Sequence, residues 1–298
     1  MADSFNPFGT EAAEAQRQQS PLARVLALGR FALFAVLFFV ILKMIERLGT
    51  GFGTGLHRLY WSALFGNLEV AIATLAATFI LARMGGRRFG FYGLGKSPCG
   101  NRFGLGSACG FAALTLLLSV MRLLGVFYFG PAMQQGSALA GFALVYAALF
   151  FVVALSEETL FRGFALVSLT EAITFWPAAL VLAFIFGWVH AGHQEESRAG
   201  LAFAGLFGVV LAYSFKRTGS LWFAIGLHAA WDFAESFVYG VPDSGVVVPG
   251  SWRSPVFHGP AWLTGAAAGP EGSYLMIFVL IGLAIAVRAL FPAERSPS

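Results

Sequence analysis

Three charged side chains lie close together inside a long apolar stretch of the sequence, in the segment ALSEETLFRG at residues 154–163. Glu158 and Arg162 are four residues apart, so on a helix they share a face and can form an ion pair. Glu157 is turned by about 100° from Glu158 and is left without that partner. An unpaired carboxylate in a low-dielectric cavity suits a general base that takes a proton from water. A purely structural Glu–Arg–Glu cluster is the alternative interpretation.

Two histidines on two further apolar segments can complete such a site. His190 ends the segment FGWVH, with Phe186 four residues earlier on the same helical face. In HAAWD, His228 and Asp232 are again four residues apart, which lets the carboxylate fix the orientation and tautomer of the imidazole. His193, in HAGHQEE, is a weaker candidate because we expect it in an outer loop. A carboxylate cluster and two histidines on three segments are hard to explain by packing alone.

This combination of Glu, His and Asp suits the activation of water for hydrolysis. Glu157 would take the proton of a water, His190 would help to position that water, and His228 would stabilise the oxyanion on a scissile carbonyl. The same three residues are also suited to bind Zn²⁺ and leave the fourth position to water. Spacing leaves both mechanisms open. The sequence contains no HExxH, Gly-x-Ser-x-Gly or paired-aspartate motif, which argues against the commonest zinc, serine and aspartyl intramembrane proteases.

The composition is that of a membrane protein. The 298-residue chain is 58% hydrophobic and only 11% charged, with a mean hydropathy of +0.75. A soluble protein carries about a quarter charged residues, so this chain lacks the polar groups to cover a soluble surface. We therefore expect a polytopic integral membrane protein whose surroundings are a lipid bilayer. Basic residues are not interleaved with aromatics in a patch, so no nucleic-acid partner is expected. Cys99 and Cys109 are expected to be free thiols.

Apolar segments of about 20 residues, the length that crosses a bilayer as a helix, recur along the chain. We expect an all-α fold of about eight transmembrane helices, with the active site in an intramembrane cavity. Residues 1–21 are expected to form a disordered cytoplasmic tail, and residues 22–298 a single transmembrane domain. Within it, residues 240–272 are rich in Gly and Pro and should form a long loop. The expected spans are residues 25–45, 62–83, 104–127, 138–162, 175–191, 199–216, 220–239 and 273–291.

Basic residues orient these spans, since Lys and Arg favour cytoplasmic loops. The loop after the second span contains no acid and carries Arg83, Arg87, Arg88, Lys96 and Arg102. With this loop in the cytoplasm, both ends of the chain are expected there too, and for a bacterial source the membrane would be the inner one. A conflict follows from these spans. Glu157 should lie in the cytoplasmic half of its span and His190 at the outer end of the next, although catalysis requires the two to meet.

Other ionisable residues in the spans receive structural interpretations. Glu69 and Arg122 lie at similar depths of the second and third spans, which predicts a structural ion pair between them. Glu235 lies near the outer end of the seventh span, where we expect its side chain to face water.

The motifs EETLFR, FGWVH and HAAWD resemble three motifs of one family, in the same order along the chain. These are the Glu-Glu-x-x-x-Arg, Phe-x-x-x-His and His-x-x-x-Asn/Asp motifs of the CPBP family, also called Abi. The family contains CAAX proteases, bacteriocin-processing proteins and the type II CAAX prenyl endopeptidases. The resemblance covers about residues 100–240, which would form the protease core. It implies a water-activating Glu157 with His190 as its partner, and support from Glu158 and Arg162.

The resemblance also implies that His228 and residue 232 form the oxyanion site, and here the sequence departs from many relatives. Those relatives have Asn, which can donate a hydrogen bond, whereas an ionised Asp232 only accepts. Asp232 would instead orient His228 and leave the imidazole as the main donor. The family has been described both as metalloproteases and as metal-independent glutamate proteases. The resemblance therefore leaves Zn²⁺ open as a cofactor.

The leading hypothesis for function is an intramembrane endopeptidase that cleaves a peptide or membrane-anchored protein substrate near the membrane surface. That substrate would be a prenylated CAAX protein or, for a bacterial source, a leader peptide, a peptide pheromone or a membrane-anchored protein tail. A non-proteolytic immunity or scaffold protein on the same fold is the alternative, and the complete motifs favour the enzyme. A small transporter with a proton relay is disfavoured because the sequence shows no internal repeat.

Overall fold

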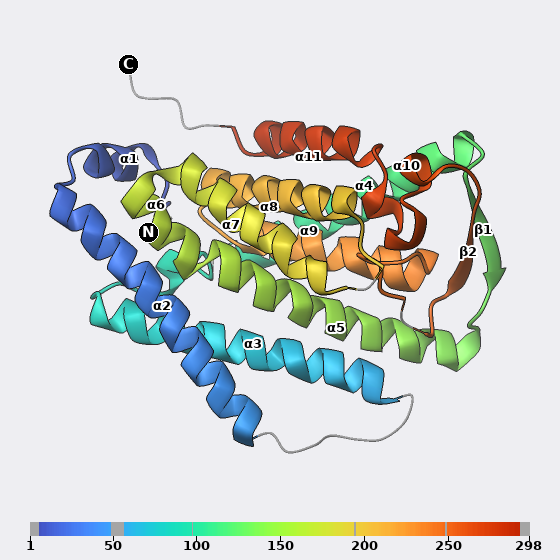
Figure 1. Cartoon of the computed structure of the whole chain (residues 1–298), viewed down its shortest axis with the longest axis horizontal. Coiled ribbons are helices and arrows are strands. Elements are labelled where there is room, and N and C mark those ends of the chain that lie inside the picture. The colour runs from blue at the N-terminus through green and yellow to red at the C-terminus, as the bar shows by residue number, and fades with distance from the viewer. Residues whose placement is uncertain (1–5, 49–56, 97, 194, 248, 293–298) are drawn as a thin grey trace.

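The computed structural model describes residues 6–48, 57–96, 98–193, 195–247 and 249–292. Its elements form one helical bundle with a two-stranded ribbon at one end (Figure 1). The helices are α1 (Thr10–Arg17), α2 (Pro21–Leu48), α3 (His57–Met84), α4 (Cys99–Leu123), α5 (Gly136–Arg162), α6 (Phe164–Ile173), α7 (Phe175–Val189), α8 (Arg198–Thr218), α9 (Trp222–Asp232), α10 (Ala261–Thr264) and α11 (Met276–Leu290). A π-helix (Phe233–Tyr239) continues α9, and the strands are β1 (Phe127–Ala132) and β2 (Arg253–Phe257).

The fold is all-α and polytopic, as predicted. Six helical segments of the described chain are long and apolar enough to cross a membrane. They are Pro21–Leu48, Trp61–Met84, Cys99–Leu123, Gly136–Ile173, Phe175–Gly192 and Arg198–Thr218. The seventh and eighth expected spans are represented by the shorter helices α9, of 11 residues, and α11, of 15 residues. The helices present large apolar side chains outward, including Phe39, Phe184 and Phe278, as contact with lipid requires.

The predicted difference in depth between Glu157 and His190 disappears because the chain runs on through α6 before it turns back into α7. Helix α6 follows α5 after a break at Gly163, and α7 starts just after Thr174 and runs back along the bundle (Figure 1). Glu157 precedes Thr174 by 17 residues and His190 follows it by 16. Since the helical rise is the same on both sides of the turn, the two residues return to a similar depth.

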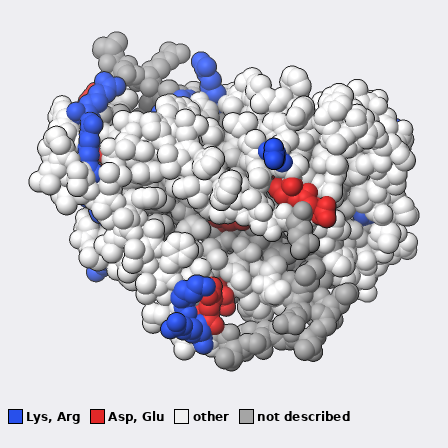
Figure 2. Space-filling model, in the orientation of Figure 1, with Lys and Arg blue, Asp and Glu red and all other residues white. Residues whose placement is uncertain are grey.

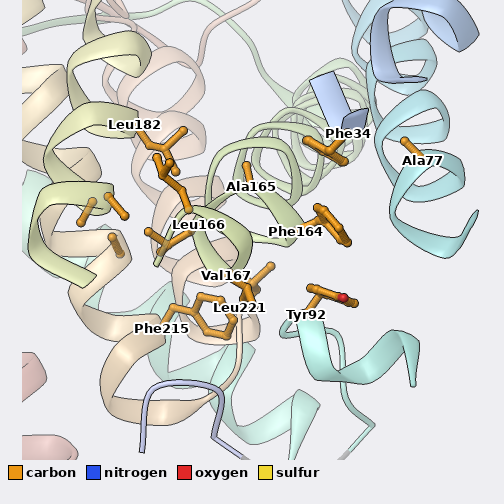
Figure 3. Close-up of a cluster of buried hydrophobic side chains, with 14 of the residues drawn as sticks. Phe34, Ala77, Tyr92, Phe164, Ala165, Leu166, Val167, Leu182, Phe215 and Leu221 are labelled. Atoms are coloured by element: carbon orange, nitrogen blue, oxygen red, sulfur yellow. The ribbon is translucent and has the colours of Figure 1, made fainter. Parts of the chain in front are cut away.

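Helix α6 is anchored in a cluster of buried apolar side chains (Figure 3). Phe164 packs between Phe34 of α2 and Tyr92, with ring centroids 5.2 Å and 4.8 Å away. Leu166 and Val167 turn toward the side of Phe215 and Leu221 in the same cluster. All ten residues of α6 except Glu171 and Ile173 are buried. This burial holds the end of α5, which carries the charged motif, in the middle of the bundle.

The close packing of α4 on α9 depends on small residues. A Cβ atom at Gly106 would lie 2.1 Å from the carbonyl oxygen of Phe223, and one at Gly110 would lie 2.1 Å from that of Leu227. No real side chain tolerates such distances, so only glycine permits this approach. The spacing of the two glycines is the small-xxx-small pattern of close helix pairs in membranes. The contact sets the position of α9 and therefore of His228.

The prediction of a disordered tail is wrong for the part of residues 1–21 that the structure describes. Residues Thr10–Arg17 form α1. Phe8 is buried, with its ring centroid 5.1 Å from that of Phe175 and 4.9 Å from that of Phe215, and the side-chain amide of Asn6 donates to the carbonyl of Lys216. A single aromatic residue thus anchors a segment whose average composition is polar. Residues 1–5 lie outside the described residues.

Two strands were not expected. The third predicted span extended to residue 127, but α4 ends at Leu123 and the aromatic run that follows forms β1. Strand β1 pairs antiparallel with β2 from the loop 240–272, with Phe127 opposite Phe257. Phe127 is fully buried, so the ribbon covers one end of the bundle (Figure 1).

The predicted ion pair between Glu69 and Arg122 is wrong, because no salt bridge joins these two described residues. Helix α3 packs against α2 and α5, whereas α4 packs along α9. Equal depth in the membrane therefore does not bring the two side chains together. The guanidinium of Arg122 instead lies 4.5 Å from the centre of the Tyr128 ring.

Charged side chains occupy few places on the face of the molecule shown in Figure 2, which is otherwise uncharged. Helices α1, α3, α8 and α11 each carry Lys or Arg in their last turn, and these helix ends lie toward one end of the bundle (Figure 1). Arg217 Nε donates to the carbonyl of Phe291, and Trp222 Nε1 to that of Gly95, so these segments contact one another. The two described ends of the chain thus lie at the same end of the bundle.

Candidate active site

A cavity of about 220 Å³ lies between the helices of the bundle. Glu157 of α5, His190 at the end of α7, and His228 and Asp232 of α9 all line it. The three sequence motifs, which are far apart along the chain, thus contribute side chains to one space. Leu149, Phe150 and Val153 of α5, with Asn67 of α3, form a further wall.

Glu158 and Arg162 form the predicted pair, with Arg162 Nη1 3.0 Å from Glu158 Oε1. Both side chains are almost completely buried, at 3% and 0% exposure for Arg162 and Glu158. The same oxygen of Glu158 lies 3.0 Å from His228 Nδ1. Because an ionised carboxylate only accepts, Nδ1 is the donor in this bond. Glu158 therefore joins α5 to α9 and turns the Nε2 atom of His228 away from itself.

Glu157 stands outside the Glu158–Arg162 pair, as predicted, and faces His228 instead. Its side chain is 25% exposed, and its Oε2 atom lies 3.8 Å from His228 Nε2. This oxygen is buried and has no hydrogen-bond partner among the described residues. A buried carboxylate oxygen is costly unless a donor reaches it, so the position favours a water or a substrate group.

His190 is held by the turn that precedes it. Its Nδ1 atom lies 2.8 Å from the carbonyl oxygen of Phe186. A carbonyl oxygen accepts, so Nδ1 carries a proton, and the neutral ring then has its lone pair on Nε2. The His190 ring also meets the Phe186 ring edge-on at a centroid distance of 4.9 Å. This arrangement leaves Nε2 as the atom that can accept a hydrogen bond from water.

His228 and Asp232 lie on one face of α9, as their spacing predicted. His228 Nε2 is 3.5 Å from Asp232 Oδ2, so Asp232 and Glu157 approach the same ring nitrogen from two sides. Both side chains are buried within α9. Phe207 of α8 meets the His228 ring edge-on at 5.8 Å and restricts its rotation.

Phe186 connects the charged pair to the histidines. The guanidinium carbon of Arg162 lies 4.1 Å from the centre of its ring, a cation–π distance. Phe161 packs against the same ring at 5.3 Å. The second motif, Phe-x-x-x-His, thus supplies both a histidine and the aromatic face that covers Arg162.

Sequence analysis missed several polar residues that line the cavity. They are Asn67, Ser236, Asp243, Ser244 and Glu271. His193, a weaker candidate, lines the cavity as well, with Nδ1 3.0 Å from the carbonyl oxygen of Ser244. Two of the missed residues, Asp243 and Glu271, are the only acids in the predicted loop 240–272. Acids in a loop of such a sparsely charged chain are a signal that could have identified them.

The prediction that Glu235 faces water is wrong, since its side chain is completely buried. The π-helix turns Glu235 inward, where its Oε2 atom accepts a hydrogen bond from Trp231 Nε1 at 2.9 Å. The loop that follows folds back over the end of α9 and covers the residue.

A metal site needs several ligand atoms close together. Among the described residues, one group of His, Cys, Asp or Glu side chains meets this condition. It consists of Glu235, Asp243 and Glu271, whose ligand atoms lie within 4.8 Å of one another. The sequence suggested Glu157, His190 and His228 as ligands for Zn²⁺. Among the described residues, their ligand atoms do not come together as such a group.

Comparisons with known proteins agree with the three motifs. The family model for the Rce1-like type II CAAX prenyl endopeptidases matches residues 139–234. This segment runs from Leu139, near the start of α5, past the end of α9, and it contains all the residues predicted for the active site. Searches of curated proteins and of solved structures each found no match. The family resemblance predicted from the motifs is confirmed by this match at residues 139–234.

Proposed function

We propose that the protein is an intramembrane endopeptidase of the CAAX type, which hydrolyses a peptide bond of a membrane-associated substrate with a water activated by Glu157. One observation carries this proposal: Glu157, His190 and His228 come from three helices and line one cavity. A protein that serves only as a scaffold or immunity factor needs no such convergence. The family match over residues 139–234 supports the same activity.

Glu157 and His190 form the water-activating side of the cavity. A water between them donates one hydrogen bond to the unpartnered Glu157 Oε2 and one to His190 Nε2. Glu157 takes a proton from this water while the oxygen attacks the scissile carbonyl carbon. The tetrahedral intermediate then collapses, the C–N bond breaks, and Glu157 returns the proton to the leaving nitrogen.

His228 stabilises the oxyanion of that intermediate. Its Nδ1 donates to Glu158, so Nε2 is the ring atom left to donate to the developing negative charge. Donation from both nitrogens requires the imidazolium form. Glu158, Glu157 and Asp232, each within 4.0 Å of a ring nitrogen, compensate its charge. Asp232 orients this ring and is a positioning residue.

This metal-free route is proposed in place of the zinc alternative for a geometric reason. Zn²⁺ needs three protein ligands at about 2.0–2.2 Å from one point. Glu157, His190 and His228 form no convergent group among the described residues. Both ring nitrogens of His228 already face carboxylates. The residues therefore do not fit a zinc site as they stand.

The cavity favours an extended peptide with apolar surroundings. The cavity of about 220 Å³ offers room for the reacting peptide group beside the proposed catalytic residues. Leu149, Phe150 and Val153 make one wall apolar, as suits a substrate that is membrane-anchored, prenylated or led by an apolar peptide. We further propose that the basic end of the bundle, where both chain ends lie, faces the cytoplasm.

The experiment is a cleavage assay with the purified protein in nanodiscs. Prenylated CAAX peptides, their unprenylated forms and leader-type peptides are incubated with wild type and Glu157→Ala, and products are identified by mass spectrometry. We expect wild type to cleave at least one of these classes of peptide and Glu157→Ala to cleave none of them. Cleavage that survives in Glu157→Ala contradicts the mechanism. If wild type leaves all of these peptides uncleaved and its thermal stability is normal, the result favours the scaffold or immunity alternative.

A further inference from the structure

A second group of acids lies beside the proposed catalytic residues and takes no part in the water-activating step. Glu235 belongs to the π-helix, Asp243 to the turn that follows it, and Glu271 to the short helix Pro270–Gly272. Their ligand oxygens all lie within 4.8 Å of one another. Three separate segments thus place three carboxylates around one point.

Glu235 is the best-buried member of this acidic triad (Glu235, Asp243 and Glu271). Its side chain has 0% exposure. One oxygen accepts from Trp231, but the other, Oε1, is buried without any hydrogen-bond partner among the described residues. Glu235 thus brings a buried, unsatisfied oxygen to a group of three acids whose ligand atoms lie within 4.8 Å of one another, a setting that a bound cation would stabilise.

The surrounding protein supplies little positive charge to the triad. In the described part of the chain, no Lys, Arg or His nitrogen lies within salt-bridge distance of these three carboxylates, whereas Glu158 has both Arg162 and His228. The nearby donors are neutral. The single N–H of Trp231 is shared between Glu235 and Glu271, with Nε1 2.9 Å from an oxygen of each, and Ser244 Oγ donates to Glu271 at 2.7 Å. These bonds orient the carboxylates without compensating their charge.

We propose that Glu235, Asp243 and Glu271 bind a hard divalent cation, Ca²⁺ or Mg²⁺. Both ions prefer carboxylate oxygens and complete their shells with water. The triad offers oxygen ligands alone, without the His or Cys that favours zinc or copper. A dication also offsets more of the negative charge of three carboxylates than a single shared proton does.

The cation has a structural consequence for the cavity. Asp243 and Glu271 line the cavity together with His228 and Asp232. Binding ties the loop segments that carry Asp243 and Glu271 to the π-helix that continues α9. The ion therefore holds this wall of the site in place and does not touch the reacting water. This role is independent of whether the protein is a protease.

The test measures cation binding directly and needs no substrate. Wild-type protein in nanodiscs of zwitterionic lipid is stripped with EDTA, and CaCl₂ and MgCl₂ are titrated separately by calorimetry and by thermal unfolding. We expect saturable binding of at least one ion and a Tm that rises with its concentration. Glu235→Gln and Glu271→Gln bind that ion at least about tenfold more weakly, the lower end of what changes around metal sites cost.

Glu69→Gln is the matched control, since it removes one membrane-embedded carboxylate away from the triad and should bind like wild type. Glu271→Gln and Asp243→Asn, at half-buried positions, carry the test if Glu235→Gln does not fold. The proposal is overturned if wild type shows no saturable binding and no Tm rise, which would mean that the acids share protons instead. Equal responses in wild type and in all triad variants overturn it as well.

Discussion

The oxygen Oε1 of Glu158 lies 3.0 Å from His228 Nδ1, and this one contact joins the first and third motifs inside the bundle. The same oxygen also accepts from Arg162 at 3.0 Å. The pair that sequence spacing predicted within one helix is therefore part of a network across two helices. The charge of Arg162 is compensated and the orientation of His228 is fixed, whereas Glu157 Oε2 has no hydrogen-bond partner among the described residues.

Glu158→Gln should strongly destabilise the protein, because it leaves Arg162 buried without its counter-charge. Removing one partner of a buried ion pair costs about 3–5 kcal/mol of unfolding free energy. Lys43→Met is the control, since the Lys43–Glu46 pair is exposed and such pairs contribute about 0–1 kcal/mol. The measurement is denaturant unfolding in matched detergent micelles. Equal losses in the two variants would contradict the network.

Gly110→Ala tests whether the close contact of α4 with α9 positions His228. The new Cβ would lie 2.1 Å from the carbonyl oxygen of Leu227, so α9 has to move. Such overpacking costs about 1–3 kcal/mol and should lower cleavage as well. Gly104→Ala lies on the same helix, where a Cβ meets nothing within 4 Å. It should leave cleavage intact and raise stability by about 0.5–1 kcal/mol. Indistinguishable variants would count against the contact.

Much of the secondary structure could be predicted from hydropathy, because a bilayer requires long apolar helices. The motif residues could also be identified, since i, i+4 spacing places Glu158 beside Arg162 and His228 beside Asp232. What spacing cannot supply is contact between helices. The bond from His228 to Glu158 depends on how α9 sits against α4 and α5, which glycines determine through close approach.

The errors have equally specific causes. Glu235 was expected in water because it lies near a helix end, but a π-helix and a returning loop bury it. The depth of His190 was misjudged because α5 and α6 form one continuous apolar stretch, Gly136–Ile173, in which hydropathy does not show the break at Gly163. Phe8 looked like part of a disordered tail because composition averages over neighbours, whereas one ring is enough to bind a pocket between Phe175 and Phe215.

Asp232→Asn should retain cleavage, whereas Asp232→Ala should not. Asp232 Oδ2 lies 3.5 Å from His228 Nε2, and an asparagine can place its side-chain oxygen at the same position and keep the ring oriented. Alanine leaves the ring free to shift, and a displacement of about 1 Å can cost about 10²-fold in rate. The measurement is the separate determination of kcat and KM. A purely structural role predicts equal thermal destabilisation in the two variants and no rescue of kcat by Asn.

The stability of the protein without added cation should fall as the pH rises. Burial raises the pKa of Asp243 well above its usual range, and the charges of Asp232 and Glu271 raise it further. Burial also raises the pKa of Glu196. The folded protein keeps these protons at pH values where the unfolded chain has released them. The free energy of unfolding therefore decreases with pH, from the ordinary carboxylate range up to the raised values.

Denaturant unfolding from mildly acidic to neutral pH checks this dependence. Asp243→Asn should make the decrease shallower, and so should a saturating divalent cation, which favours the ionised triad. A stability that increases over this range, or a slope unchanged in Asp243→Asn, is the contrary result.

The most direct test of the account is the cleavage rate of Glu157→Gln under single-turnover conditions, on a peptide that wild type cleaves. Glutamine keeps the shape of the side chain but cannot take a proton from water. We predict that the rate of the chemical step falls by about 10²–10⁴-fold, the usual contribution of a general base, while substrate binding and Tm stay at wild-type values. A Glu157→Gln variant that cleaves at the wild-type rate would contradict the central claim that Glu157 activates the water.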